Sequence, residues 1–379
     1  MAEKDLGYRR VQSTGRGSFI ISLPKDWVQD IGLKRGNEIS FNVQPDSSLV
    51  LVPRKLRETG TESDEAKPKE YCVNVDPKEG SESILRMIRA LYAIGSDIIH
   101  VRFKSPEDGE KYKTQVKNFA RDTFLGSEII DETPVEVTLQ ILIRHSEFPI
   151  EKAVRRMAIV SLSADKDAIA ALKNRSTVLI ESVINGHNDV TRLGLYIVRQ
   201  LKYGIERNLF RELGFRTPKE FLLYRIAVND IENIGENAMN IINNLGTFQK
   251  MIDDETLFVK EPIDEEIHAQ LVHFNGLAHQ LFEDAIKAMF KREYKDAERL
   301  ISRRESFVPL ENELRMLMNS KKLDPNLASV LRLIFDSSRR IMDYGRNISE
   351  LTLNRTVEEN CSALSLSKIN CYGGTQLIG

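Results

Sequence analysis

Two acidic side chains four residues apart are the residues of this sequence best placed to do chemistry. Glu232 and Glu236 are separated by about one helical turn, so both carboxylates lie on one face of a predicted helix. Such a pair can hold a metal ion inside a helical bundle if facing helices add ligands. The more common role of this spacing is a charged face in contact with water. Asp230, which lies off that face, is also expected in solvent.

The text around this acidic pair recurs later in the chain. An offset of 107 residues places Glu232 on Arg339 and Glu236 on Asp343. A guanidinium carries positive charge and no lone pair, so Arg339 repels a cation instead of binding it. The second copy therefore keeps an acidic residue at Asp343 and has Arg339 in place of the other one.

Positive charge gathers at the N-terminus of a chain that is slightly acidic as a whole. Residues 1–57 contain ten Lys and Arg against six Asp and Glu, a difference of +4, whereas the formal net charge of all 379 residues is −2. Local positive charge on a small domain is what binding to a DNA phosphate backbone requires. A soluble surface with scattered basic residues explains the same composition, and on composition alone it is slightly favoured.

Other catalytic patterns are missing from the sequence. The six histidines form no HExxH motif, and no GxxxxGK[ST], GxGxxG or GxSxG motif occurs. The three cysteines have neither metal-type spacing nor the even number of a disulfide framework, so reduced thiols are expected. The sequence therefore predicts a protein that is not an enzyme.

Composition and hydropathy indicate a soluble protein. Apolar residues make up 41% of the chain and charged residues 29%. The first residues lead into no apolar core of a signal peptide, and no uncharged apolar stretch reaches the roughly 18 residues of a membrane span. We expect no membrane insertion and a cytoplasmic location.

The basic residues belong to a predicted β-rich domain at residues 1–57. Its strand-like runs lie at 19–23, 38–43 and 49–52 and are separated by turn residues. One short helix is predicted at 24–31. Residues 58–69 have almost no apolar side chains and are predicted as a solvated linker.

The middle of the chain, residues 70–147, alternates strand and helix signals. Their order predicts a small α/β domain of βαβαββ type with a mixed sheet. Such a domain could bind a small ligand, act as a spacer or form a second dimer interface. A structural role is the interpretation we favour.

The acidic residues belong to a long helical region. From residue 148, apolar residues recur at three- and four-residue intervals, and the breaks between them predict about six helices. The internal duplication predicts two tandem three-helix bundles, at 148–250 and 251–356. Residues 357–379 show no period and are expected to be a disordered tail.

The turn and strand signals of the basic N-terminus follow a specific order. The text GRGSFIISLPKDW begins at Gly15, IGLKRGNEI begins at Ile31, and the apolar run LVLVP begins at Leu49. This order resembles the SpoVT/AbrB swapped-hairpin family. The resemblance implies an obligate dimer, in which two chains interleave into a β-barrel.

In that family, basic residues of the first strand and of the hairpin turn contact DNA. The matching positions in this sequence are Arg9, Arg10 and Arg16, and Lys25 matches a basic or polar position at the start of the helix. The resemblance therefore implies these four residues as the DNA-binding site. The alternative within the family is a module that only dimerises and has lost DNA binding.

The acidic pair lies in the text DIENIGENAMNI at residues 230–241, inside the duplicated helical region. This text and the duplication resemble the PhoU family, over roughly 148–355. Glu232 and Glu236 match its two acidic positions, Asp343 matches the second one in the second repeat, and Arg339 departs from the pattern.

The PhoU resemblance implies regulation of phosphate uptake, by an adaptor that restrains a phosphate transporter and its regulatory partners. Because some PhoU proteins bind metal clusters, it also implies divalent or iron ions at Glu232, Glu236 and Asp343.

We therefore expect a homodimeric, DNA-binding regulator of phosphate homeostasis. The alternative is a protein–protein adaptor that restrains the ATPase of a phosphate ABC transporter, or a signalling partner, with the N-terminal domain only dimerising. A third class, a metal-dependent enzyme, would need stoichiometric metal on the face of Glu232 and Glu236.

Overall fold

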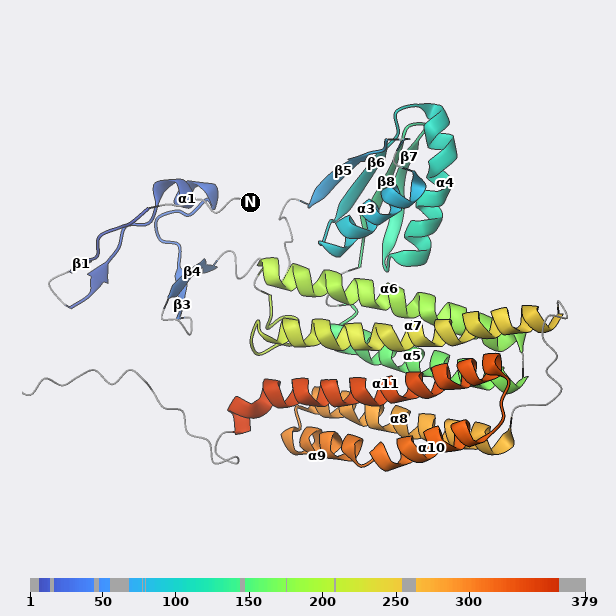
Figure 1. The fold of residues 1–379 in the computed structure, drawn as a ribbon. Coiled ribbons are helices and arrows are strands. Elements are labelled where there is room, and N and C mark those ends of the chain that lie inside the picture. Colours follow the sequence, from blue (N-terminus) through green and yellow to red (C-terminus); the bar gives the residue numbers. More distant parts are fainter. Residues whose placement is uncertain are drawn as a thin grey trace, which may run out of the picture. The chain divides into compact units, whose positions relative to one another are not determined.

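The chain divides into two units, residues 1–68 and 69–379, which are described separately. The computed structural model describes residues 7–13, 17–43, 48–54, 68–76, 78, 80–143, 147–174, 176–207, 209–253 and 264–360. Over these residues the protein is mainly helical, with small sheets near the N-terminus and in the middle, as the sequence predicts (Figure 1). The domain boundaries stay a prediction.

Over its described residues, the first unit has two antiparallel strand pairs and one short helix. Its elements are β1 (Gln12–Ser13), β2 (Phe19–Ile20), α1 (Lys25–Asp30), β3 (Ile39–Val43) and β4 (Leu49–Pro53). β1 pairs with β2 and β3 with β4, both antiparallel, in two separate two-stranded sheets. β2 is shorter than the run predicted at 19–23. Closure into a barrel stays a prediction, since a single chain is described.

The first part of the second unit is a small α/β domain. Its elements are β5 (Glu70–Asn74), α3 (Ser81–Ala93), β6 (Ile98–Arg102), α4 (Pro106–Thr123), β7 (Ser127–Thr133) and β8 (Glu136–Ile141). The strand order is β5-β6-β8-β7, with β5 and β6 parallel and the other pairs antiparallel. Both helices pack on the sheet face that carries Val73, Val101 and Leu139.

The second part is a layer of long helices (Figure 1). They are α5 (Ile150–Asn174), α6 (Thr177–Arg207), α7 (Glu220–Asp253), α8 (Glu265–Lys291), α9 (Tyr294–Glu305), α10 (Val308–Ser320) and α11 (Pro325–Thr356). The described residues thus form seven helices here instead of about six, because the chain turns at Ser306 and Phe307, just before Pro309 enters the first turn of α10.

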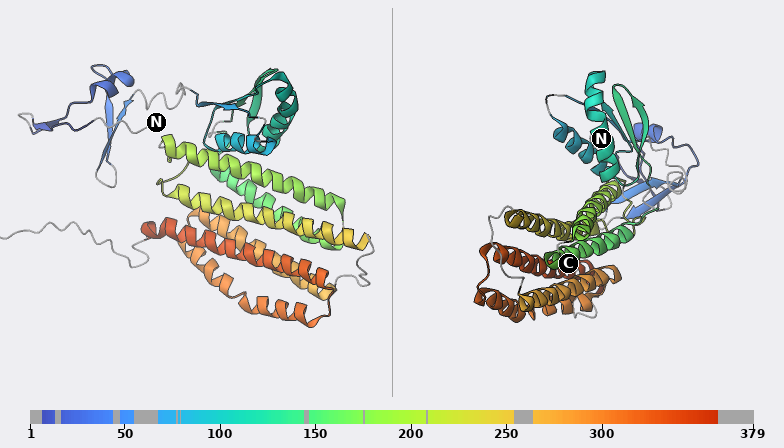
Figure 2. Two further views of the ribbon diagram at one scale, coloured as in Figure 1. Left: turned by 45° about the horizontal axis from the view of Figure 1, so that its top comes forward. Right: turned by 90° about the vertical axis from the view of Figure 1, so that its right-hand side faces the viewer.

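The helices form two halves that pack side by side. We call α5–α7 the first half and α8–α11 the second half (Figure 2). They meet along a seam where α7 packs on α11 and α5 packs on α8. One apolar core, which includes Tyr196, Phe274 and Phe282, runs through both halves. None of the helices within the described ranges has the length and apolar character needed to cross a bilayer.

One end of the seam is held by ion pairs. Glu220, which is buried at the start of α7, accepts hydrogen bonds from Arg292 (2.9 Å) and from Arg355 of the second half. Arg292 ends α8 in the left-handed conformation, with φ of 60°, and also pairs with Glu359. Glu359 lies in the 3-10 turn η2 (Val357–Asn360). Residues 361–379 lie outside the described part of the chain.

A buried arginine joins the α/β domain to the first half. Arg199 of α6 is 5% exposed, and its Nη1 donates to the carbonyl oxygens of Tyr92 (3.0 Å) and Ser96 (2.7 Å), at the C-terminal end of α3. Its Nη2 lies 3.5 Å from Asp97. Burial lowers the pKa of Arg199, and the neighbouring Tyr92 and Asp97 counteract this effect. Leu195, one turn earlier on α6, completes the core of the α/β domain.

Candidate functional site

The first acidic residue of the motif lies half-buried between α6 and α7. The Glu232 side chain covers Gly194 of α6, and its carboxylate lies 3.8 Å from the Arg225 guanidinium. Burial raises the pKa of Glu232, and the positive charges of Arg225 and Arg89 counteract this effect. Gly194 leaves room for this side chain, because a Cβ there would approach the carboxylate oxygen of Glu232 to 2.2 Å.

The second acidic residue, Glu236, is more open to solvent. Its Oε1 lies 3.0 Å from Nε2 of His187 on α6, and its side chain is 60% exposed. The structure therefore places both carboxylates on the α6 side of α7, as their spacing predicts. Two carboxylates and one imidazole already paired with Glu236 fall short of a metal centre, and the described residues contain no group of three or more potential metal ligands.

The corresponding position in the second half is occupied by positive charge. Asp343 accepts a hydrogen bond from Arg304 (2.8 Å) and lies 3.6 Å from the Arg339 guanidinium. Arg304 is buried and also pairs with Glu311 at 2.7 Å. Asp343 is not brought together with Glu232 and Glu236, and its two arginines oppose a cation. These residues do not fit a shared metal site.

Asp230 is buried, so the expectation that it faces solvent is wrong. It is 6% exposed and lies in the seam, where Asn347 of α11 is its hydrogen-bonding neighbour. Its Oδ2 has no hydrogen-bond partner. Burial raises the pKa of Asp230 to about 6. One feature of the sequence could have indicated that Asp230 is buried. The 107-residue offset aligns it with Ser337, a small uncharged residue, which the structure shows to be buried as well.

The candidate DNA-binding residues are exposed where the structure describes them. Arg9 and Arg10 precede β1, and Lys25 is the first residue of α1. Arg9 Nη1 donates to the carbonyl oxygen of Tyr8 (3.0 Å). Arg16 lies outside the described residues. The first unit thus carries accessible positive charge, and DNA contact by these four residues stays a prediction.

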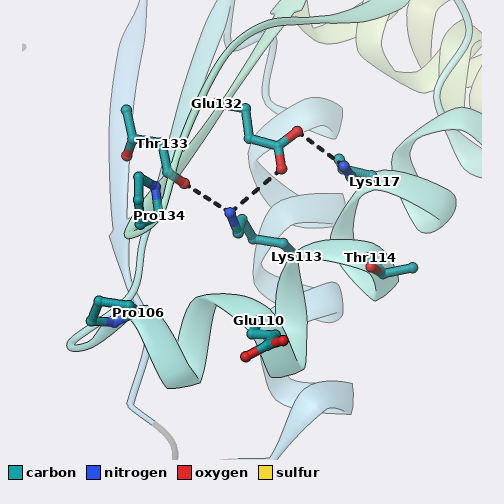
Figure 3. A pocket seen from close by; sticks show the side chains of 8 residues that line it. All are labelled: Pro106, Glu110, Lys113, Thr114, Lys117, Glu132, Thr133 and Pro134. Atoms are coloured by element: carbon teal, nitrogen blue, oxygen red, sulfur yellow. Dashed lines mark hydrogen bonds and ion pairs between the residues drawn. The ribbon is translucent and has the colours of Figure 1, made fainter.

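An open hollow of the α/β domain lies between α4 and the β7–β8 hairpin (Figure 3). Lys113 and Lys117, one helical turn apart, both point at Glu132, with Lys117 Nζ at 2.9 Å. Lys113 also donates to the carbonyl oxygen of Thr133 at 2.9 Å. Lys117 and Lys113 lower the pKa of Glu132. Glu110 also lines the hollow, so two carboxylates match its two lysines, which fits the structural role favoured for this domain.

Two segments of the chain match known family models. Residues 12–59 match a model described as antidote-toxin recognition MazE, bacterial antitoxin, and residues 154–245, within the first half, match the PhoU domain. These matches confirm the two predicted resemblances, to an AbrB-like N-terminal module and to PhoU. No match is found among curated proteins.

A solved structure of PhoU from Pseudomonas aeruginosa is similar to this chain. It has 18% sequence identity and a TM-score of 0.40, over 55% of this chain and 96% of the PhoU chain.

Proposed function

We propose that this protein is a non-enzymatic, homodimeric regulator of phosphate homeostasis, in which a DNA-binding module precedes a helical sensor and adaptor. The observation that carries the proposal is the presence on one chain of a MazE-like segment at 12–59 and a PhoU segment at 154–245. The first supplies a contact to DNA, and the second a helical surface for a partner that reports phosphate status.

Dimerisation is supported by apolar side chains that the first unit leaves exposed. Phe19 on β2 is 77% exposed, and Phe41 and Val43 on β3 are 63% and 74% exposed. A two-stranded hairpin is marginally stable by itself, because it has no partner for its apolar face. A second copy of the same unit would cover these side chains, as interleaved strands require.

DNA binding is supported by charge and exposure together. The first 57 residues have a charge of +4 in a chain of −2, and Arg9, Arg10 and Lys25 are exposed. Most affinity of such a module would come from phosphate contacts, which release counterions and make binding salt-dependent. A dimer doubles the number of these contacts.

The test is binding of the full-length protein to DNA from its own upstream region, measured by fluorescence anisotropy at a series of salt concentrations. In the parent, the logarithm of affinity should fall linearly with the logarithm of salt concentration. Changing Arg9, Arg10 and Arg16 to Ala removes three positive charges per protomer. If each contacts one phosphate, the slope should decrease by roughly 5 for the dimer.

A matched control removes the same charge far from the module in sequence. Lys152→Ala, Lys202→Ala and Lys219→Ala change three exposed lysines of the helical region and should leave the slope unchanged. Salt-insensitive or absent binding by an intact dimer would overturn the DNA part. The alternative, an adaptor that restrains the ATPase of a phosphate transporter, would then be favoured by co-purification of that ATPase.

The α/β domain is proposed to act as a structural joint. Arg199 and Leu195 fix it to α6, and the charges of its hollow are internally paired. A thermal-shift screen of the full-length protein against small metabolites tests this role. Stabilisation that disappears in Lys113→Ala would show a ligand site instead.

A further inference from the structure

A group of buried polar side chains joins the two halves in the middle of the seam. Asp165 of α5 is fully buried, and it lies among polar side chains of α8 and α11. We call this group the Asp165 cluster. Its members are Asp165, Asn275, His279, Ser337 and Ser338.

Both carboxylate oxygens of Asp165 have donors, and every donor comes from the second half. Oδ2 accepts from Asn275 Nδ2 at 2.7 Å and from His279 Nε2 at 2.9 Å. Oδ1 accepts from Ser337 Oγ at 3.2 Å. A buried carboxylate without such partners would destabilise the folded state strongly. The alignment of the halves in which Asp165 has these hydrogen bonds is therefore strongly preferred to alignments shifted along the seam.

The donors are themselves held in place. Asn275 Nδ2 also donates to Ser338 Oγ at 3.1 Å, and Ser338 Oγ donates to the carbonyl oxygen of Ile334 at 3.1 Å. The chain of hydrogen bonds therefore ends on the backbone of α11. A shift of α5 along the seam cannot carry these donors with it, because they are fixed to the helices of the other half.

The apolar part of the seam does not provide this selectivity. Apolar side chains tolerate repacking of similar volume, and helices can move past one another by one turn, about 5.4 Å. A second buried carboxylate of the seam, Asp230, has an oxygen without a partner, so it selects an alignment less strongly. A third, Glu220, pairs with Arg292 and Arg355 and fixes the alignment at one end of the seam. In the middle of the seam, the Asp165 cluster is the contact that distinguishes one alignment from another.

We propose that the Asp165 cluster fixes the alignment of the two halves. Hydrogen bonding, and not apolar contact, then sets the position of one half relative to the other, and the two halves behave as one body. This goes beyond the proposed function and does not depend on it. Binding of a partner to one half would then also affect the other half, whatever the protein regulates.

The test measures the distance between the halves. Cys72, Cys361 and Cys371 are first changed to Ser, and spin labels are attached through Lys202→Cys on α6 and Glu298→Cys on α9, both exposed positions. Pulsed electron paramagnetic resonance on the full-length protein should show one narrow distance distribution. In Asp165→Ala we expect a broadened distribution, or a second population displaced by about one helical turn, 5.4 Å.

Two variants separate alignment from a general loss of polarity. Asp165→Asn can direct its carbonyl oxygen at Asn275 and His279 and its amide at Ser337, so it should keep the narrow distribution. Ser161→Ala removes a fully buried hydroxyl of α5 that bonds only within its own helix, to Ala158 at 3.0 Å, and it should have no effect.

A distribution in Asp165→Ala as narrow as that of the parent, and at the same distance, would overturn the proposal. If Asp165→Ala does not fold, Asn275→Ala removes the donor that Asp165 and Ser338 share, and the same readout applies. An unchanged distribution in that variant overturns the proposal as well, and a broadened one supports it.

Discussion

The last helix of each half, α7 and α11, occupies an equivalent place in the repeat, yet the two helices carry opposite charges at one pair of matching positions. On α7, Glu232 and Glu236 face α6, with one cation at 3.8 Å and one imidazole at 3.0 Å. On α11, Arg339 stands in place of Glu232, and Asp343 is held by a buried Arg304. The repeat determines which positions lie near a neighbouring helix. The side chains of that neighbouring helix then determine which charge is favourable at each of these positions.

The seam shows the same contrast between equivalent positions. Asp230 of α7 and Ser337 of α11 align at the 107-residue offset, and both are buried. Ser337 donates to Asp165, whereas Asp230 has an oxygen without a partner and a raised pKa. Burial at equivalent positions therefore does not mean equivalent energetics.

The strongest test of the contrast is Arg304→Ala in the second half. This change leaves Glu311 buried without its cation and removes the nearest donor of Asp343. We expect a loss of about 3 kcal/mol in the free energy of unfolding, measured by urea denaturation. Arg303→Ala, which breaks a more exposed pair with Asp284, should change it by less than about 0.5 kcal/mol. Equal losses of stability in Arg304→Ala and Arg303→Ala would contradict the distinction between the buried and the exposed ion pair.

Asp230→Asn should have the next largest effect, in the opposite direction. The unfolded carboxyl ionises near 3.8 and the folded one near 6, so the folded state binds more protons between these values. This contribution to the stability of the parent therefore falls as pH rises from about 4 to about 6 and stays low above that. The variant should be more stable by about 2 kcal/mol at pH 7.

The difference between Asp230→Asn and the parent, followed by urea denaturation from pH 4 to pH 7, isolates this residue from the other carboxyls. A difference that does not grow with pH would show that Asp230 is ionised without penalty. Ser161→Ala removes a buried hydroxyl that bonds to the carbonyl oxygen of Ala158 in its own helix, so it should show no such pH dependence.

Replacing a glycine that allows close packing of two helices should destabilise the second half more than the first. A Cβ on Gly345 of α11 would lie 3.2 Å from the backbone Cα of Phe282 and 2.7 Å from the Leu281 side chain, so Gly345→Ala should destabilise the protein by about 1.5 kcal/mol. Gly194→Ala on α6 displaces the mobile end of Glu232 and favours the helix, so its net effect should be smaller. Thermal unfolding of both variants measures the difference.

The smallest effect is expected from His187→Ala in the first half. The pair between His187 and Glu236 is open to solvent, since the Glu236 side chain is 60% exposed. Removing it should change the free energy of unfolding by less than about 0.5 kcal/mol, and less still at high salt. A larger loss, measured by urea denaturation, would indicate that the acidic pair is more tightly held than its exposure implies.

Local patterns in the sequence predicted the elements but not the contacts between distant ones. Alternating and three-to-four-residue spacing gave the α/β domain and the long helices, because these patterns reflect the faces that each element buries. The break before α10 was missed, although Pro309 marks it. The burial of Asp230 was missed because α7 is covered on two sides, by its own half and by α11.

The candidate site shows the same limit. The spacing of Glu232 and Glu236 predicted their common face correctly, since it depends only on the helix period. The partner of Glu236 could not be predicted, because His187 comes from another helix. The same holds for Asp343, whose partner Arg304 lies on α9. The bond between Asp165 and Ser337 joins residues 172 positions apart, and only the packing of the helices brings them together.

The anchoring of α6 to the α/β domain has a practical consequence for anyone who wishes to prepare the helices alone. A protein shortened to begin at α5 would present Leu195 to water and leave Arg199 without the carbonyl groups of Tyr92 and Ser96. Such a fragment should aggregate at concentrations where the full-length chain stays in solution. Crystallographic or partner-screening work is therefore better begun from Lys69 than from the PhoU segment itself.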